Sequence, residues 1–202
     1  MAKNPENKQK SPVNSLDRVC YTPSTPQIIL KPQGSVLSVP EPGELILPGS
    51  FNPLHDGHLE MASVATRKLG RACWFELSIV NADKNRLADS NIANRLNQDF
   101  REFGLVLTHA ATFAEKSALF PGAIFVVGAD TIIRIGDLKY YGSDQGQFDQ
   151  AIRQIEGNGC QFLIFGRKVA NKFIQQQNIS LCKNLMSMCR FVDRVEFEND
   201  LS

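Results

Sequence analysis

The chain has 202 residues, 43% of them hydrophobic, which fits one globular domain of ordinary size with residues to spare for a tail. Its formal net charge is +1, from 22 basic and 21 acidic residues, which excludes a nucleic-acid footprint spread over the whole surface. For the same reason no nucleic-acid partner is expected. No run of about 18 apolar residues occurs, so no membrane span is expected either. The five cysteines are scattered without a CxxC pair, which favours reduced thiols and predicts a cytoplasmic location.

Residues 1–43 differ from the rest of the chain in composition. They hold seven of the ten prolines, with polar residues in most of the gaps, which predicts a poorly ordered tail or linker. The short apolar patch at 28–30 is expected at most to dock locally, because the surrounding prolines disfavour a continuous element. Residues 44–202 form the candidate domain.

From residue 44 onward, short apolar runs alternate with amphipathic segments. The predicted strands are the runs at 44–48, 73–80, 105–109, 123–128, 160–166 and 191–197. Several of them are almost continuously apolar, as expected for strands that are covered on both faces.

Four helices are predicted between these strands. They are a helix over 58–69 that Gly70 ends, a helix that Ser90 caps and that runs on to Phe103, a helix that Asp130 caps, and a helix over 147–156. This alternation implies an α/β fold, a Rossmann-like open parallel sheet with helices on both faces. In such sheets, ligands bind beyond the carboxyl ends of the strands, where the strand order reverses.

The segment GSFNPLHDGH, residues 49–58, joins the first predicted strand to the first predicted helix. Gly49 lets the backbone approach a ligand closely, and Gly57 leaves room for a phosphate group. His55 and His58 are expected to share a face near the helix N-terminus, where free N–H groups and a partial positive charge favour an anion. The two imidazoles could instead cap the helix or satisfy each other. They could also be two zinc ligands, but no third ligand is in view.

The same segment resembles the GxFxPxHxGH signature of the HxGH nucleotidyltransferase superfamily, and its FNP form is most similar to nicotinamide and nicotinate mononucleotide adenylyltransferases. The similarity continues downstream. Residues 78–84 resemble the SPVNxxYxK segment, 125–130 the GxD strand end, and 165–167 an arginine-bearing strand end. The resemblance implies the Rossmann-like fold and transfer of AMP from ATP to a mononucleotide phosphate, with release of pyrophosphate, in NAD biosynthesis.

Roles for individual residues follow from the resemblance alone. The catalytic set would be His55, His58 and Lys84, which hold or neutralise phosphates. The nucleotide-binding set would be Gly49, Ser50, Phe51, Asn52, Gly57, Arg95, Gly128, Asp130 and Arg167. Mg2+ is implied because ATP arrives with it. Lys84 and Arg95 could instead be ordinary solvated side chains, Asp130 a plain helix cap, and Arg167 a surface charge.

The chain also departs from the family pattern. Members end in an ISSTxxR segment that grips the outer phosphates of ATP, and residues 198–202 resemble only its opening, so we expect a domain that is cut short at its C-terminus. Members often stack the pyridine ring on a tryptophan, where this chain has Tyr140 and Tyr141. The single tryptophan, Trp74, is expected in the core.

The expected partners are ATP and a small phosphate-bearing acceptor, and the sequence leaves homo-oligomerisation open. Two other functions also stay open. One is a related adenylyl- or cytidylyltransferase with another acceptor, such as a phosphopantetheine or a phospho-alcohol. The other is a nucleotide-binding module without turnover.

Overall fold

The computed structural model describes residues 28–30, 40–80, 89–169, 172–174 and 179–192. For residues 28–30, 89, 167–169 and 172–174 it describes the backbone alone.

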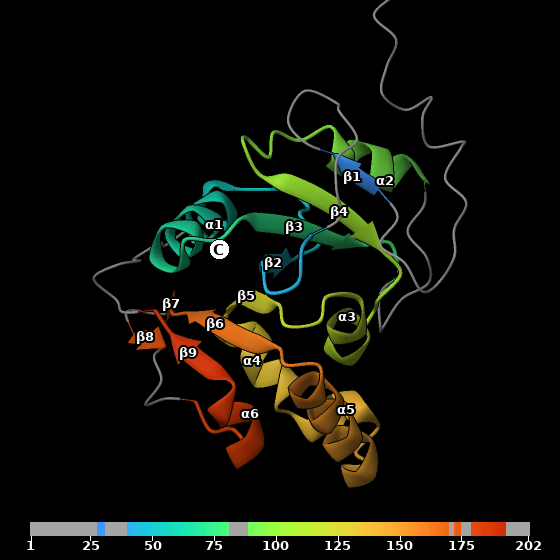
Figure 1. Ribbon diagram of the computed structural model, residues 1–202, viewed down its shortest axis with the longest axis vertical. Helices are drawn as coiled ribbons and strands as arrows, with labels where there is room; N and C mark the ends of the chain where they lie inside the picture. Colours follow the sequence, from blue (N-terminus) through green and yellow to red (C-terminus); the bar gives the residue numbers. More distant parts are fainter. Residues whose placement is uncertain (1–27, 31–39, 81–88, 170–171, 175–178, 193–202) are drawn as a thin grey trace, which may run out of the picture.

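A seven-stranded sheet forms the centre of the molecule (Figure 1). Its strands are β1 (Ile28–Leu30), β2 (Leu45–Pro48), β3 (Cys73–Ser78), β4 (Gly104–Thr108), β5 (Ile124–Gly128), β6 (Gln161–Phe165) and β9 (Cys189–Phe191). They lie in the order β1-β4-β3-β2-β5-β6-β9, and all neighbours are parallel except β1, which runs antiparallel to β4. A separate hairpin pairs β7 (Arg167–Val169) with β8 (Lys172–Ile174). The six parallel strands confirm the predicted Rossmann-like open sheet.

Helices cover both faces of this sheet (Figure 1). They are α1 (Asp56–Leu69), α2 (Asp89–Leu96), α3 (Phe113–Leu119), α4 (Ala129–Ile135), the 3-10 helix η2 (Leu138–Tyr141), α5 (Gln145–Gly157) and α6 (Lys183–Ser187). Successive strand residues point to opposite faces, so Leu45 and Leu47 pack with α1 and α2, whereas Ile46 packs with α3 to α6. The near-continuous apolar runs are therefore explained, because each strand is buried on both sides.

The predicted helix boundaries need three corrections. Ser90 is not a cap, because α2 already begins at Asp89 and ends at Leu96. Phe100 and Phe103 lie beyond that helix, yet both are buried in the core. Asp130 does not cap α4 either, since Gly128 is its N-cap residue and Asp130 lies in its first turn. Gly70 ends α1 as predicted, with φ 63° in the left-handed region.

Other elements also differ from the sequence prediction, among them the last strand and one helix. The last strand of the sheet, β9, spans 189–191, and most of the predicted run at 191–197 lies outside the described residues. Helix α3 was not predicted, although Thr112 and Glu115 form a capping box at its start. That pattern, Thr-x-x-Glu before a helix, is a recognisable start signal in sequence.

Part of the proline-rich leader belongs to the sheet. Residues 28–30 form β1 on the free edge of β4, with Ile28 opposite Leu107 and Leu30 opposite Leu105. Residues 1–27 and 31–39 lie outside the described residues. Trp74 is in the core as predicted, and its Nε1 donates a hydrogen bond to Glu44 Oε2 at 2.6 Å. Within the described ranges, no helix has the length and apolar character needed to cross a bilayer.

Candidate functional site

The signature segment begins where the strand order of the sheet reverses. The chain proceeds from β2 outward to β3 and β4, then crosses back to place β5 on the other side of β2. The loop after β2 starts at Gly49, and β5 ends at Gly128, so both glycines lie at the carboxyl ends of the two central strands. In open α/β sheets this is where a crevice for a ligand forms.

The conformation of the signature loop depends on Phe51. Its φ of 44° lies in the left-handed region, which is strained for a residue with a side chain. The ring is 1% exposed and packs edge-to-face against Phe75, Phe100 and His58. A Cβ on Gly49 would lie 2.4 Å from this ring, so the glycine makes room for Phe51. Phe51 therefore anchors the loop in the core and can offer a ligand only its backbone.

Ser50 and Asn52 flank Phe51 and both are exposed. The Asn52–Pro53 peptide bond is cis. The two exposed polar residues on either side of a buried ring are consistent with a loop that presents its polar groups outward. Their assigned role in nucleotide binding stays a prediction.

His55 and His58 lie together at the start of α1. Their rings stack with centroids 3.7 Å apart and an interplanar angle of 27°. His55 is the N-cap residue, and the two side chains are turned toward each other's backbone as in a capping box. Nδ1 of His58 accepts a hydrogen bond from the backbone N–H of His55 at 3.4 Å. Within the described part of the chain, Nδ1 of His55 has no hydrogen-bond partner.

His58 is neutral at pH 7. Burial, and to a lesser extent the neighbouring His55, together lower its pKa from the ordinary 6.5 to about 4. Because Nδ1 accepts a hydrogen bond, the single proton of the neutral ring is placed on Nε2. His58 therefore has an Nε2–H donor, and the charge of a bound phosphate would raise its pKa again.

The first turn of α1 adds backbone donors next to the histidines. The helix is 14 residues long, so its N-terminal N–H groups carry a partial positive charge. Gly57 is buried within this turn, and Asp56 is exposed and pairs with Arg101 at 3.3 Å. Backbone amides and two imidazoles at a helix N-terminus form a combination that suits a phosphate group.

The structure gives fewer contacts for the other predicted site residues than for the histidine pair. Arg95 is half-buried on α2, and its Nε has no hydrogen-bond partner among the described residues. Gly128 has open space where a Cβ would stand, and Asp130 follows it in the first turn of α4. Arg167 is described by its backbone in β7, and Lys84 lies outside the described residues. The roles assigned to these five residues stay predictions.

Tyr140 and Tyr141, the two candidates for stacking a pyridine ring, differ from each other. Tyr141 donates a hydrogen bond from its hydroxyl to the carbonyl of Ile135 at 2.9 Å and packs edge-to-face on Phe148. Tyr140 is 45% exposed, with Nζ of Lys139 5.0 Å from its ring centroid. Tyr141 is therefore held at the end of the α4 segment, and Tyr140 has the more exposed ring.

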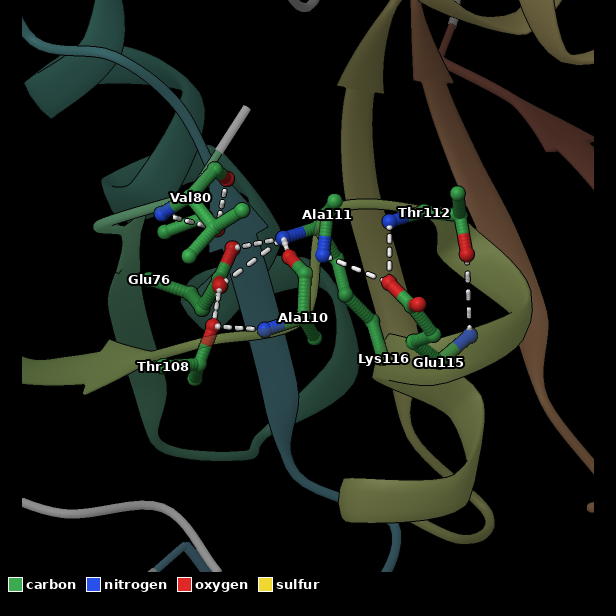
Figure 2. Close-up of polar contacts among 9 residues, drawn as sticks. Glu76, Val80, Thr108, Ala110, Ala111, Thr112, Glu115 and Lys116 are labelled. Atoms are coloured by element: carbon green, nitrogen blue, oxygen red, sulfur yellow. Dashed lines mark hydrogen bonds and ion pairs between the residues drawn. The ribbon is translucent and has the colours of Figure 1, made fainter. Parts of the chain in front are cut away.

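A buried ionic cluster beside the loop was missed by the sequence prediction (Figure 2). Nζ of Lys116 on α3 donates to both carboxylate oxygens of Glu76 on β3 at 2.8 Å and to the carbonyl of Ala110 at 2.7 Å. The hydroxyl of Thr108 donates to Glu76 Oε1 and accepts from the backbone N–H of Ala110. Glu76 is 0% exposed and Lys116 5%.

This cluster is joined to the signature loop through the backbone. The carbonyl oxygen of Glu76 accepts a hydrogen bond from the N–H of Gly49 at 3.0 Å. The signal in the sequence was the single acidic residue within the apolar run CWFELSIV. A charged side chain needs a partner when its strand is covered on both faces. The identity of the partner could not be read, because Lys116 lies 40 residues away.

Gln98 was missed as well. Its side chain donates to the carbonyl of Phe51 at 2.8 Å and accepts from the N–H of Leu54 at 2.6 Å. These two hydrogen bonds fix the backbone of the signature loop to a residue that lies outside the loop in the sequence.

The chain was compared with curated proteins and with models of protein families. No curated protein matches the chain. A model of the family described as cytidylyltransferase-like matches residues 46–194, a range that begins in β2, contains the complete signature segment and extends past β9. Among the described residues, no group of three or more His, Cys, Asp or Glu side chains could hold a metal ion. The matched range covers most of the sheet and the histidine pair, so the chain belongs to the cytidylyltransferase-like family, and its membership indicates nucleotidyl transfer as the class of reaction.

Proposed function

We propose that the protein transfers AMP from ATP to the phosphate of nicotinamide or nicotinate mononucleotide. An oxygen of the acceptor phosphate attacks the α-phosphorus of ATP, the bond from that phosphorus to the bridging oxygen breaks, and pyrophosphate leaves. The FNP form of the signature supports this acceptor, and membership of the family supports nucleotidyl transfer.

The observation that carries the proposal is the neutral His58 stacked on His55 at the N-terminus of α1. Its Nε2–H can donate to a phosphate oxygen, and His55 with the first-turn amides can contact the same triphosphate. Such donors stabilise charge that develops on the leaving pyrophosphate. The reaction needs no covalent nucleophile, since alignment of the two substrates can supply roughly 7–11 kcal/mol of the barrier.

Mg2+ fits this site as a companion of the nucleotide. It prefers oxygen ligands and usually keeps several waters while it binds substrate phosphates, whereas the site offers imidazole nitrogens and amide N–H groups. The triphosphate oxygens would therefore hold most of its coordination sphere. Bound in that way, Mg2+ would neutralise charge on the phosphates.

The test is a pyrophosphate-release assay on the purified full chain with MgATP and each pyridine mononucleotide. We expect turnover that depends on both substrates and is lost in His58→Ala. Parallel assays replace ATP by CTP, and the mononucleotide by phosphopantetheine or a phospho-alcohol. Turnover with one of these pairs and not with a pyridine mononucleotide would overturn the proposed acceptor and leave nucleotidyl transfer standing.

A second candidate is cytidylyl transfer, which the description of the matched family favours. The third is nucleotide binding without turnover. Calorimetry with ATP and with CTP separates these functions, because tight binding of either nucleotide without pyrophosphate release would reject every enzymatic proposal.

A further inference from the structure

Gln98 closes the signature loop with a single side chain. Its Nε2 donates to the carbonyl of Phe51 at 2.8 Å, and its Oε1 accepts from the N–H of Leu54 at 2.6 Å. These two backbone groups lie at the two ends of the segment 51–54, and His55 follows directly. The shape of the loop before the histidine pair is therefore set by a residue 47 positions away in the sequence.

The same side chain also binds the end of α2. Nε2 of Gln98 donates to the carbonyl of Arg95 at 3.2 Å, and the backbone N–H of Gln98 donates to that oxygen at 3.3 Å. Carbonyls in the last turn of a helix otherwise lack a partner. Gln98 thus joins the helix that carries Arg95 to the loop that carries His55.

Glutamine suits position 98 because the loop needs one hydrogen-bond donor and one acceptor at the same distance from the backbone of residue 98. A carboxylate accepts but does not donate, leucine does neither, and asparagine is one methylene shorter. The loop also contains Phe51 in the left-handed region, a conformation that costs on the order of 1–3 kcal/mol and persists only where its surroundings fix it. The ring of Phe51 is fixed by the core, and its carbonyl is fixed by Gln98.

We propose that Gln98 is a positioning residue for nucleotidyl transfer. It holds residues 51–54 in the shape that aligns the His55–His58 pair with the N-terminus of α1. Gln98 acts through the loop, since within the described residues its side chain bonds to backbone groups and to no imidazole atom. Its effect on turnover rests on the proposed function, whereas its effect on the histidine rings does not.

The kinetic test compares Gln98→Leu and Gln98→Glu with a matched control, Gln154→Leu. Gln154 on α5 also donates its side-chain amide to a backbone carbonyl, that of Ala114 at 3.0 Å, but on α3 and away from the signature loop. We expect Gln98→Leu to lower kcat on the order of 100-fold, because a displacement of about 1 Å can cost that much, with less than tenfold change in KM for ATP. Gln98→Glu keeps the acceptor for Leu54 and loses the donors, so we expect its kcat to lie between that of Gln98→Leu and that of the unmutated protein.

Two kinetic results would overturn the proposal. One is a kcat of Gln98→Leu within about twofold of the unmutated protein. The other is an equal loss in Gln154→Leu, which would show a general response to a lost hydrogen bond. Gln98→Glu keeps the side-chain shape, so it serves as the decisive variant if Gln98→Leu does not fold.

A second measurement is independent of turnover. The chain has three histidines, so the imidazole cross-peaks in a carbon–proton NMR spectrum can be assigned by substitution. We expect the peaks of His55 and His58 to shift in Gln98→Leu and in Gln98→Glu, while the peak of His109 stays in place. Unshifted peaks of His55 and His58 in a folded variant would refute the inference. If the unmutated protein shows no turnover, the proposed function fails, and these shifts alone decide on Gln98.

Discussion

Two polar pairs lie near the carboxyl ends of the central strands, and they are built in opposite ways. Lys116 and Glu76 are buried, and Nζ of Lys116 uses its three donors on Glu76 and on Ala110. His55 and His58 are half-buried, and they leave Nδ1 of His55 without a partner in the described residues and Nε2–H of His58 as a donor. A polar group whose bonds are all made internally holds a structure together, whereas one that keeps bonds in reserve can receive a ligand.

The largest effect is expected from breaking the buried pair. Lys116→Met leaves the carboxylate of Glu76 buried without its counter-ion, and we expect the free energy of unfolding to fall by about 3–5 kcal/mol. Urea denaturation measures this change. The double variant Glu76→Gln/Lys116→Met removes both charges and should regain part of the loss.

A matched control for this prediction is the exposed pair of Lys139 and Asp137. It has a similar distance, 2.7 Å, but a Lys139 side chain that is 65% exposed, so Lys139→Met should change stability little. Equal losses in Lys116→Met and Lys139→Met would contradict the distinction between a buried and an exposed ion pair in this fold.

The second prediction concerns turnover. We expect His58→Ala to lower kcat on the order of 100- to 1000-fold, as when one donor to a developing anion is removed, with a much smaller effect on stability. The assay for pyrophosphate release measures this loss. His109→Ala serves as the control because His109 directly follows β4 and has no assigned contact with substrate. If both variants lost the same activity, the histidine pair would not be the site of charge stabilisation.

The smallest effect is a dependence of stability on pH. The pKa of His58 is about 4 in the folded chain and 6.5 as its ordinary value, so between these values the unfolded chain binds more protons. The stability that depends on neutral His58 is therefore fully present above pH 6.5 and is lost as the pH falls toward 4. Urea midpoints between pH 4 and 7 should fall less steeply in His58→Gln. Parallel curves for the two proteins would show that burial does not shift this pKa.

The sequence predicted the parts of the molecule that depend on local patterns. The apolar runs at 44–48 and 123–128 contain β2 and β5 because strands covered on both faces need little but apolar residues. The signature segment predicted the loop and the shared face of His55 and His58, although α1 begins at Asp56, two residues before the predicted start. Each of these features is set by residues within about ten positions of one another.

What the sequence did not predict depends on distant contacts or on small local choices. Lys116 and Gln98 look like ordinary solvated residues until folding brings them to partners 40 and 47 positions away. Asp130 was expected as a cap, but the extended backbone of Gly128 already occupies that position. The packing of the Phe51 ring against Gly49, which leaves no room for a side chain there, was also not predicted.

The antiparallel pairing of β1 with β4 bears on how the domain is delimited. The match to the family begins at residue 46, yet the hydrogen-bonded sheet already includes residues 28–30. A fragment cut at the family boundary would uncover the backbone donors and acceptors of Leu105 to Leu107, and an open strand edge of that kind is a template for aggregation. Expressed fragments that begin upstream of Ile28 therefore keep β1 on the edge of β4, whereas fragments that begin at residue 46 lose it.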